Sequence, residues 1–444
     1  MLFQQLVDED LGCACYLVGD EAAGVCVVVD PPLHVEPVLG EAERRGLRIE
    51  RVLETHTHAD HVSGHGRLAL EHAVPVSIHH AADPDYPFEP VEDGDVVEVG
   101  AVAVTCLHTP GHRPEHCAFA VADRTRSDEP WFVLTGDSLF VGDAARPDLA
   151  VEAREGARGL YRSLGRLLAL PDGVEVYPGH VAGSLCGAAM SSKSSTTIGF
   201  ERRFNPLLTL GGEDEFVEAS TGSAGVRPPN VERVVALNRG PWVAAPAPPG
   251  PVAGAGGAVV LDVRPATVHA AGHVRGSINV PVSGSAFGTK AGFVLPLDRP
   301  IVLHAENADE ALLAARRLAA VGFLELGGVL ERAEATDRTA PVDLEELERL
   351  LAEDAVDLID VREIDEHDDG YIPGSRHVPY RILGELSDGL GSKPVVTICE
   401  TGSRAAIAAS VLQARGIEAR PVLEGGVAGW RARGNTTVEF RRCG

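Results

Sequence analysis

The sequence contains no apolar run that approaches the roughly 20 residues a helix needs to cross a bilayer. Its first residues, Met1 to Gln5, have neither the basic start nor the apolar core of a secretory signal. These absences lead us to expect a cytoplasmic protein that does not bind a membrane. With 444 residues, of which 44% are hydrophobic, the chain has the size and composition of a globular protein of two or three domains.

Basic residues are also scarce. The chain has 39 Lys and Arg against 65 Asp and Glu, which gives a formal net charge of −26. Such a charge repels the phosphates of nucleic acids and of anionic membranes, so we expect neither as a partner. An anionic substrate would need a local group of basic residues to offset this field.

The chain has eight cysteines, which are scattered along the sequence. None of them forms the C-x-x-C spacing that is found in many metal and redox sites. In a chain without an export signal these are expected to be reduced thiols. Five of them fall in strand-like stretches: Cys13, Cys15, Cys26, Cys106 and Cys117. This placement predicts buried thiols that pack as small hydrophobic side chains.

Metal-binding side chains, by contrast, are concentrated in one stretch. Residues 55–61 read Thr-His-Thr-His-Ala-Asp-His and follow the strand-like run 49–53. Further candidates follow other apolar runs, so that each falls where a strand gives way to a loop. The complete set is His56, His58, Asp60, His61, His112, Asp137 and His180. Imidazole and carboxylate together suit zinc or iron, and these side chains could converge on one edge of a sheet.

The H-x-H-x-D-H stretch, followed by single His, Asp and His residues in that order, resembles the metallo-β-lactamase superfamily. The resemblance implies an αβ/βα sandwich with the metal at one rim. The expected order of elements is consistent with this fold, because strand pairs and helices follow one another as in a sandwich rather than a purely parallel sheet. The clearest helix is expected over residues 152–170, with Leu160, Leu164, Leu167 and Leu168 on one face.

The composition changes after about residue 240. Residues 241–257 are almost entirely Pro, Ala, Gly and Val, which predicts a linker. Beyond it, Asp-Val-Arg at 262–264 and the Gly272–Pro281 segment recur 98 residues later at 360–362 and 370–379. This repeated pattern resembles the rhodanese family, whose α/β domains contain a parallel sheet. We therefore expect domains at residues 1–240, 252–335 and 342–444.

The second repeat carries a candidate active loop, Cys399-Glu400-Thr401-Gly402-Ser403-Arg404, between a strand over Val395–Ile398 and a helix over 405–414. A thiol carries sulfane sulfur only as a thiolate, so its pKa must fall from about 8.5. Loop N–H groups, the helix N-terminus and Arg404 could lower it. Four residues between Cys and Arg resemble a sulfurtransferase loop and suit one sulfur atom better than a phosphate. Glu400 departs from the more usual basic or polar residue.

The first repeat lacks the cysteine and the arginine of this loop. Alignment of residues 300–302 with 394–396 places Ala305 opposite Cys399 and Glu310 opposite Arg404. Neither a nucleophile nor a cationic group remains. We interpret this repeat as an inactive rhodanese-like domain.

The metal ligands leave two activities open. In hydrolases such as hydroxyacylglutathione hydrolase, two metals share the site. One would use His56, His58 and His112, the other Asp60, His61 and His180, and Asp137 would bridge them. In persulfide dioxygenases the resemblance implies one Fe(II) on His56, His112 and Asp137, with the remaining ligands around it and zinc as a possible substitute.

The domain order decides between these alternatives. One metallo-β-lactamase domain followed by an inactive and an active rhodanese resembles bacterial persulfide dioxygenase–sulfurtransferase fusions over essentially the whole chain. Residues 181–187 resemble their G-A-G-S-x-C-G stretch, with Val181 as the one departure. Cys186, six residues after His180, could lie near the metal pocket and act in persulfide handling, or be buried as a small hydrophobic side chain. Arg146 lies near Asp137 and could bind an anionic group of the thiol or pair with Asp143 or Asp148. A non-enzymatic sulfide sensor or scaffold would not need an intact ligand set.

The interpretation is therefore an enzyme of sulfide detoxification. It would oxidise a low-molecular-weight thiol persulfide with O₂ to sulfite and thiol, and pass sulfane sulfur through Cys399 to form or use thiosulfate. Glutathione, coenzyme A and mycothiol all remain open as the thiol. We also expect a homo-oligomer.

Overall fold

The computed structural model describes residues 1–181, 191, 193–222, 226–331, 334–386, 390 and 393–439, apart from the side chains of residues 385 and 386. The chain forms two compact units, one built from residues 1–246 and the other from most of residues 247–444. Among the described residues, no helix has the length and apolar character to traverse a bilayer.

The first unit contains two six-stranded mixed sheets. The order of the first sheet follows the chain, with β1 Leu2–Val7, β2 Ala14–Asp20, β3 Val25–Val29, β4 Arg48–Leu53, β5 Val76–His79 and β6 Glu89–Val91. The second runs in the reverse order from β12 to β7, with β7 Val96–Val99, β8 Val102–His108, β9 Cys117–Asp123, β10 Phe132–Gly136, β11 Glu175–Pro178 and β12 Thr196–Thr197.

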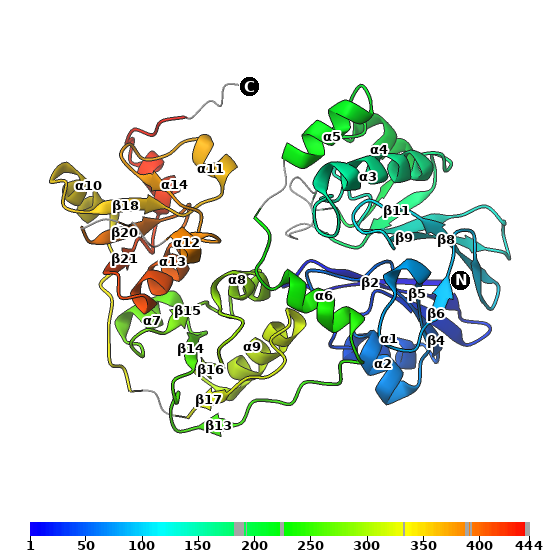
Figure 1. The fold of residues 1–444 in the computed structure, drawn as a ribbon, viewed down its shortest axis with the longest axis horizontal. Helices are drawn as coiled ribbons and strands as arrows, with labels where there is room; N and C mark the ends of the chain where they lie inside the picture. Colours follow the sequence, from blue (N-terminus) through cyan, green and yellow to red (C-terminus); the bar gives the residue numbers. More distant parts are fainter. Residues whose placement is uncertain are drawn as a thin grey trace. The chain divides into compact units, whose positions relative to one another are not determined.

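Helices cover the outer faces of these sheets (Figure 1). Residues of α1 Glu36–Arg44 and α2 His65–His72 pack with the first sheet in one apolar cluster. Residues of α3 Ala153–Leu167, α4 Ile198–Phe204 and α5 Glu213–Gly222 pack with the second sheet in another. A third cluster, which includes Val18, Val27 and Val104, lies between the sheets. This αβ/βα sandwich confirms the predicted fold class.

Helix α3 shows how the sequence pattern determines these layers. Its side chains at Leu160, Leu164 and Leu167 are buried, because their spacing places them on the face toward the second sheet. The Glu152 side chain caps its start by accepting a hydrogen bond from the Glu155 N–H. The helix ends earlier than predicted, because from Ala169 the N–H groups bond three residues back instead of four.

Apolar residues account for strands such as β3, which is apolar throughout, and β7, in which Glu98 is the one polar residue. Strand β1 was not predicted, because its Phe-Gln-Gln-Leu sequence lacks a clear apolar pattern. The short strands β6 and β12 and the helices α4, α5 and α6 Val231–Arg239 were not predicted either.

The second unit contains two parallel sheets, one for each sequence repeat, as the predicted fold class requires. The first has the order β13-β17-β16-β14-β15 and contains β13 Pro251–Val252, β14 Val259–Asp262, α7 Ala266–Ala271, β15 Ile278–Asn279, α8 Phe287–Val294, β16 Ile301–His304, α9 Ala308–Ala320 and β17 Gly328–Leu330. The predicted linker over 241–257 is therefore partly wrong, because β13 pairs with β17 at its end.

The second sheet has the order β19-β18-β20-β21. Its repeat contains α10 Leu344–Ala352, β18 Asp357–Asp360, α11 Ile364–Asp368, β19 Arg376–His377, α12 Leu383–Leu386, β20 Val395–Ile398, α13 Ser403–Ala414, β21 Ala419–Pro421 and α14 Gly426–Ala432. Strand β20 matches the prediction and lies between β18 and β21, so its end opens at the middle of the sheet.

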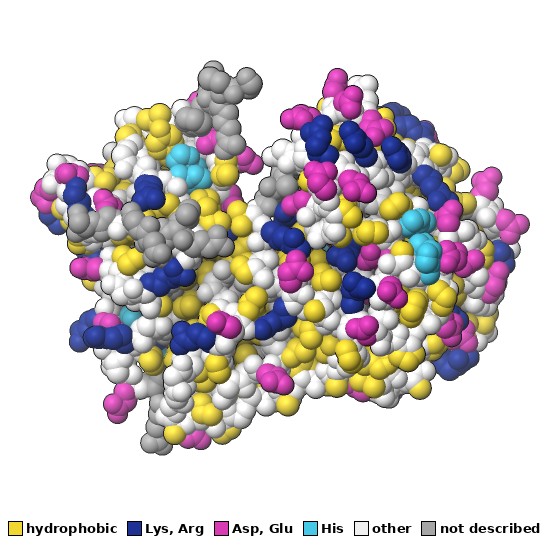
Figure 2. All heavy atoms as spheres, viewed as in Figure 1, with side chains coloured by type: hydrophobic (Ala, Val, Ile, Leu, Met, Phe, Trp, Pro, Cys, Tyr) yellow, Lys and Arg dark blue, Asp and Glu magenta, His cyan; other side chains and the backbone are white. Residues whose placement is uncertain are grey.

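The surface is mixed in charge despite the net negative charge of the chain. On the face that Figure 2 shows, acidic and basic side chains are interspersed. The basic side chains on this face are therefore largely close to acidic ones.

We predict that Leu160→Ala lowers the free energy of unfolding of the first unit by about 2–5 kcal/mol, because it removes a fully buried side chain from the core under the second sheet. Denaturant unfolding measures this change. Arg162→Ala, on the exposed face of the same helix, is the control and should change the value by less than about 0.5 kcal/mol. Equal effects of the two variants would contradict the packing of α3.

Candidate metal centre and thiol loop

The candidate metal ligands come from loops that follow four strands. The loop after β4 carries His56 to His61, and the loop after β8 carries His112. Asp137 follows β10, and His180 follows β11. These strand ends meet at one rim of the sandwich, so the structure brings together all seven ligands predicted from the sequence in neighbouring groups.

His56, His112 and Asp137 form the first group. Asp137 Oδ2 lies 3.9 Å from His56 Nε2 and 3.7 Å from His112 Nε2. All three side chains are about 1% exposed. Among the described residues, His56 Nε2 and Asp137 Oδ2 have no hydrogen-bond partner, although both atoms are buried. Burial of unpartnered polar atoms is costly, so their convergence on one point indicates a position for a metal ion.

Hydrogen bonds at the other ring nitrogens fix how these histidines are oriented. His112 Nδ1 donates to the Arg146 carbonyl oxygen at 3.0 Å. Thr55 Oγ1 donates to Asp30 and therefore accepts from His56 Nδ1 at 2.9 Å. Burial lowers the pKa of both rings, so they are neutral near pH 7. Each Nε2 thus carries a lone pair, as a metal ligand requires.

Asp137 divides its two oxygens between different neighbours. While Oδ2 faces His56 and His112, Oδ1 accepts a hydrogen bond from His180 Nδ1 at 2.7 Å. Burial alone would raise the pKa of Asp137, but His180 and His112 hold it well below its usual value. The carboxylate is therefore ionised and can act as a ligand through Oδ2.

His58 lies with two carboxylates instead of with the first group. Its Nε2 is 3.1 Å from Glu54 and 3.3 Å from Asp30, and all three side chains are buried. Burial favours the neutral ring, yet the carboxylates raise the pKa of His58 to about 10. Its Nδ1 has no hydrogen-bond partner among the described residues.

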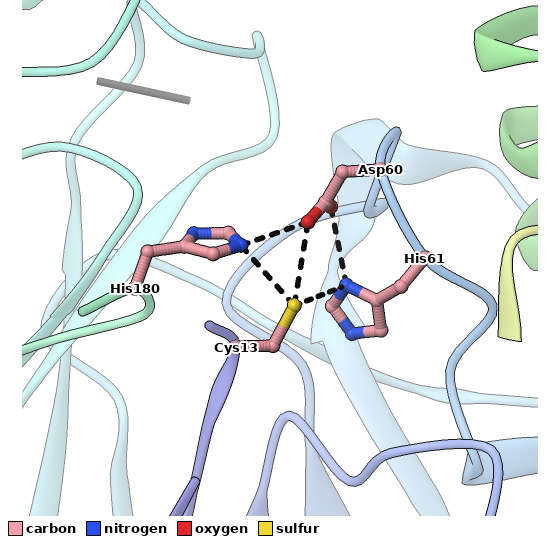
Figure 3. Close-up of side chains that lie close together, drawn as sticks. All are labelled: Cys13, Asp60, His61 and His180. Atoms are coloured by element: carbon pink, nitrogen blue, oxygen red, sulfur yellow. Dashed lines mark hydrogen bonds and ion pairs between the residues drawn. The ribbon is translucent and has the colours of Figure 1, made fainter. Parts of the chain in front are cut away.

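The remaining ligands, Asp60, His61 and His180, lie close together with Cys13 (Figure 3). The prediction that Cys13 is buried is confirmed, but its surroundings are polar rather than apolar. Cys15, Cys26, Cys106 and Cys117 are buried within the apolar clusters, as predicted.

The thiol loop lies after β20 in the second repeat. Cys399 is buried, and its Sγ accepts a hydrogen bond from the Gly402 N–H at 3.1 Å. Gly402 has a φ of +123°, and a Cβ there would lie 1.9 Å from the Leu423 carbonyl oxygen. The loop therefore needs glycine at this position. Helix α13 begins at Ser403, so its positive N-terminus lies beside the sulfur.

The charged residues of this loop are paired more closely than the sequence suggested. Arg404 makes two hydrogen bonds to Glu366, with Nη2 2.6 Å from Oε1, so part of its charge is offset. Glu400 accepts from Arg362 at 2.9 Å and from Arg431 at 2.8 Å. Glu400 therefore anchors the loop in place. Thr401 and Ser403 lie in the same turn at the start of α13.

The repeated Asp-Val-Arg motif has the same structural role in both repeats. Arg362 is fully buried and bonds to Asp360 and the Gly370 carbonyl oxygen. Arg264 bonds to Asp262 and the Gly272 carbonyl oxygen in the same way. In the first repeat Ala305 follows β16, and Glu310 accepts from the Glu306 N–H at 3.1 Å. Within residues 305–310, which the structure describes, this repeat presents no thiol and no cation after its central strand.

Comparisons with known proteins agree with this architecture. Residues 8–180 match the Metallo-beta-lactamase superfamily, and residues 252–331 and 343–433 match the Rhodanese-like domain. The mitochondrial persulfide dioxygenase ETHE1 of Homo sapiens is 30% identical over 238 residues, which cover 52% of this chain and 85% of that protein. The chain belongs to the metallo-beta-lactamase superfamily.

Two further relatives resemble this metallo-beta-lactamase superfamily protein. Hydroxyacylglutathione hydrolase of Rhodopseudomonas palustris is 35% identical over 171 residues, which cover 37% of this chain and 61% of that protein. The crystal structure of a metallo-beta-lactamase from Staphylococcus aureus superposes with a TM-score of 0.70 and 27% identity, over 74% of this chain and 99% of that chain.

Sequence reasoning missed two residues that support the metallo-beta-lactamase site. His116 Nε2 accepts from the Asp137 N–H at 3.0 Å, and burial lowers its pKa to about 3, so it stays neutral. Asn238, in α6, donates to the carbonyl oxygens of His58 and His61 and accepts from the Ser63 N–H. The spacing of His116 from His112 was a possible signal, but Asn238 lies too far along the chain for any local pattern.

Two predicted residues have different outcomes. Arg146 makes a two-pronged ion pair with Asp148, at 2.7 Å for each bond, which is one of the pairings expected from the sequence. Its backbone also holds His112. Cys186 lies outside the described residues.

We predict that Asn238→Ala lowers both stability and metal content. It leaves three buried backbone groups without their partner, each at a cost of roughly 1–3 kcal/mol, so the unfolding free energy should fall by at least about 3 kcal/mol. Thermal unfolding and metal analysis measure the two effects. Ala236→Ser, an exposed change on the same helix, should alter neither. Unchanged metal content in Asn238→Ala would contradict its role in holding the loop.

Proposed function

We propose that this protein oxidises a low-molecular-weight thiol persulfide at a mononuclear iron site and moves sulfane sulfur through Cys399. The overall reaction is RSSH + O₂ + H₂O giving RSH, sulfite and two protons. The observation that carries the proposal is the group of two imidazoles and one carboxylate formed by His56, His112 and Asp137. Such a face suits non-haem iron and leaves open positions for substrates.

Asp137 Oδ1 accepts a hydrogen bond from His180 Nδ1, which leaves Oδ2 as the oxygen that faces His56 and His112. Iron bound to the group would supply the redox chemistry that O₂ requires, which zinc lacks. The residues of the chain hold the ligands in place and, because they are buried, exclude bulk water.

A thiol loop in the same chain supports a substrate that carries sulfane sulfur. The Cys399 thiolate would attack the outer sulfur of a persulfide, form a Cys399 persulfide and release the thiol. Sulfite would then take that sulfur to give thiosulfate and return the thiolate. The Gly402 N–H and the start of α13 would stabilise the negative charge on sulfur in both states.

A dinuclear zinc thioesterase is the second candidate. The proximity of Asp60, His61 and His180 to one another and the similarity to a hydroxyacylglutathione hydrolase favour it. It would require Asp137 to bridge two ions, and it gives no role to a sulfurtransferase loop.

Metal replacement distinguishes the two candidates. We expect O₂ uptake with a thiol persulfide when the metal-free protein is reloaded with Fe(II), and none when it is reloaded with zinc. Asp137→Ala should abolish uptake, because the carboxylate ligand is lost. An oxygen electrode and metal analysis measure these effects. Equal uptake with zinc, or thioester hydrolysis as the main zinc-dependent activity, would contradict the dioxygenase.

Cys399→Ser should reduce sulfur transfer by orders of magnitude, because no neighbouring group replaces the covalent step, while O₂ uptake at the metal site persists. Thiosulfate should fall and sulfite should rise in the product mixture. Ala305→Cys in that variant should not restore transfer, because Glu310 would oppose the thiolate. Thiosulfate formation at the wild-type rate in Cys399→Ser would show that the C-terminal repeat is not the carrier.

A further inference from the structure

Arg404, the arginine of the thiol loop, is held by a carboxylate from another segment of the chain. Its Nη2 lies 2.6 Å from Glu366 Oε1, and its Nη1 bonds to Glu366 Oε2. Both side chains are partly buried. Arginine binds oxyanions through the same pair of parallel bonds. Glu366 therefore occupies the end of the guanidinium that carries both Nη atoms.

The charge of Arg404 acts on Cys399 as well as on Glu366. Burial would lower the pKa of Arg404, but Glu366 raises it above its usual value, and Cys399 acts in the same direction. Burial would raise the pKa of Glu366, yet Arg404 lowers it, so the carboxylate is ionised near pH 7. An ionised carboxylate this close offsets the positive field that would otherwise attract an anion to the sulfur.

Helix α11, which carries Glu366, has supports of its own. Glu366 Oε2 accepts a hydrogen bond from the Glu363 N–H at 3.2 Å, a contact that is typical of a capping box. The His367 ring stacks on the rings of Tyr371 and His377, at centroid distances of 4.4 and 4.1 Å. The position of the helix therefore does not depend on its ion pair with the loop alone.

Glu366 differs in this respect from Glu400, the other acidic residue beside the sulfur. Glu400 belongs to the loop and accepts from the fully buried Arg362 at 2.9 Å, so the shape of the loop depends on it. Glu366 lies 38 residues before Arg404, in a separate helix. Its charge can therefore be removed without a change in the loop sequence.

We propose that Glu366 sets the preference of Cys399 among sulfur compounds, because it occupies Arg404 and thereby weakens the binding of anionic substrates. Thiosulfate, a dianion, is such a substrate. Its outer sulfur would bond to the Cys399 thiolate while its sulfur–sulfur bond breaks, and sulfite would leave with that electron pair. A carboxylate that competes with an anion for a guanidinium gives selectivity through repulsion. The choice of thiosulfate rests on the proposed transfer through Cys399, whereas the repulsion does not.

Two alkylating reagents measure this repulsion without any sulfur transfer. Iodoacetate is an anion and iodoacetamide is neutral, and both react with the thiolate. The ratio of their rates at Cys399 therefore reports the local charge and not the amount of thiolate. Mass spectrometry of the Cys399 peptide distinguishes this thiol from the others. Glu366→Gln should raise the ratio of iodoacetate to iodoacetamide rates at least about threefold, and Glu366→Ala should do the same.

Asp365→Asn is the matched control. Asp365 is an exposed neighbour on the same helix, and its replacement changes the net charge of the chain by the same amount. This variant should leave the ratio unchanged. Addition of Arg404→Ala to Glu366→Gln should remove the gain, because the released guanidinium is its source. An unchanged ratio in both Glu366 variants, an equal rise in Asp365→Asn, or a gain that survives the loss of Arg404 would overturn the proposal.

Sulfur transfer from thiosulfate to cyanide relates the effect to a substrate. In Glu366→Gln the KM for thiosulfate should fall at least about threefold while kcat changes less, because the released guanidinium binds the anion before the sulfur moves. An unchanged KM together with an unchanged alkylation ratio would reject the role of Glu366. If neither the wild type nor the variant transfers sulfur, but Glu366→Gln still raises the alkylation ratio, the transfer through Cys399 is rejected and the role of Glu366 is supported.

Discussion

The arrangement of the side chains at the metal rim depends on the contacts that the Asp137 carboxylate makes with the surrounding histidines. It is buried and ionised, and its two oxygens face two different sets of imidazoles. A buried charge requires compensation, and removal of one partner of such a group typically costs several kcal/mol, far more than a single neutral hydrogen bond. The loop geometry that holds Asp137 is therefore closely constrained.

That constraint reaches into the backbone. Gly136 has a φ of +48°, and a Cβ there would lie 2.7 Å from His116 Nε2 and 2.8 Å from Thr55. The Asp137 N–H donates to the same His116 nitrogen. The turn after β10 can thus approach the loop after β4 only because residue 136 is glycine. This close approach of the two loops places His56 and Asp137 near enough to each other to bind the same metal ion.

The two candidate sites of the chain are built from different kinds of groups. At the rim of the sandwich the structure supplies imidazole and carboxylate ligands. At Cys399 it supplies a backbone N–H and a helix N-terminus, while the nearby arginine is largely paired with Glu366. The backbone N–H and the helix N-terminus therefore remain as the groups nearest the sulfur that can stabilise negative charge on it. This difference is consistent with a division of labour between oxidation and transfer.

The sequence predicted much of this arrangement, because most of the information was local. Val25–Val29 is a continuous apolar run, Val395–Ile398 is apolar apart from Thr397, and each predicted ligand lies in the loop that follows a strand. The sequence could not show how side chains from distant segments combine. Asn238 reaches back 177 residues to His61, and Cys13 meets His180 across 167 residues. The orientation of the His180 ring, whose Nδ1 donates to Asp137 Oδ1, also depends on contacts between segments far apart in the sequence.

Anomalous X-ray diffraction from crystals of the iron-loaded protein, recorded at the iron absorption edge, tests the central claim most directly. The account predicts one iron peak within bonding distance of His56 Nε2, His112 Nε2 and Asp137 Oδ2, with Asp137 Oδ1 still bonded to His180. Two metal peaks bridged by Asp137, with His58 as a ligand of one of them, would contradict it.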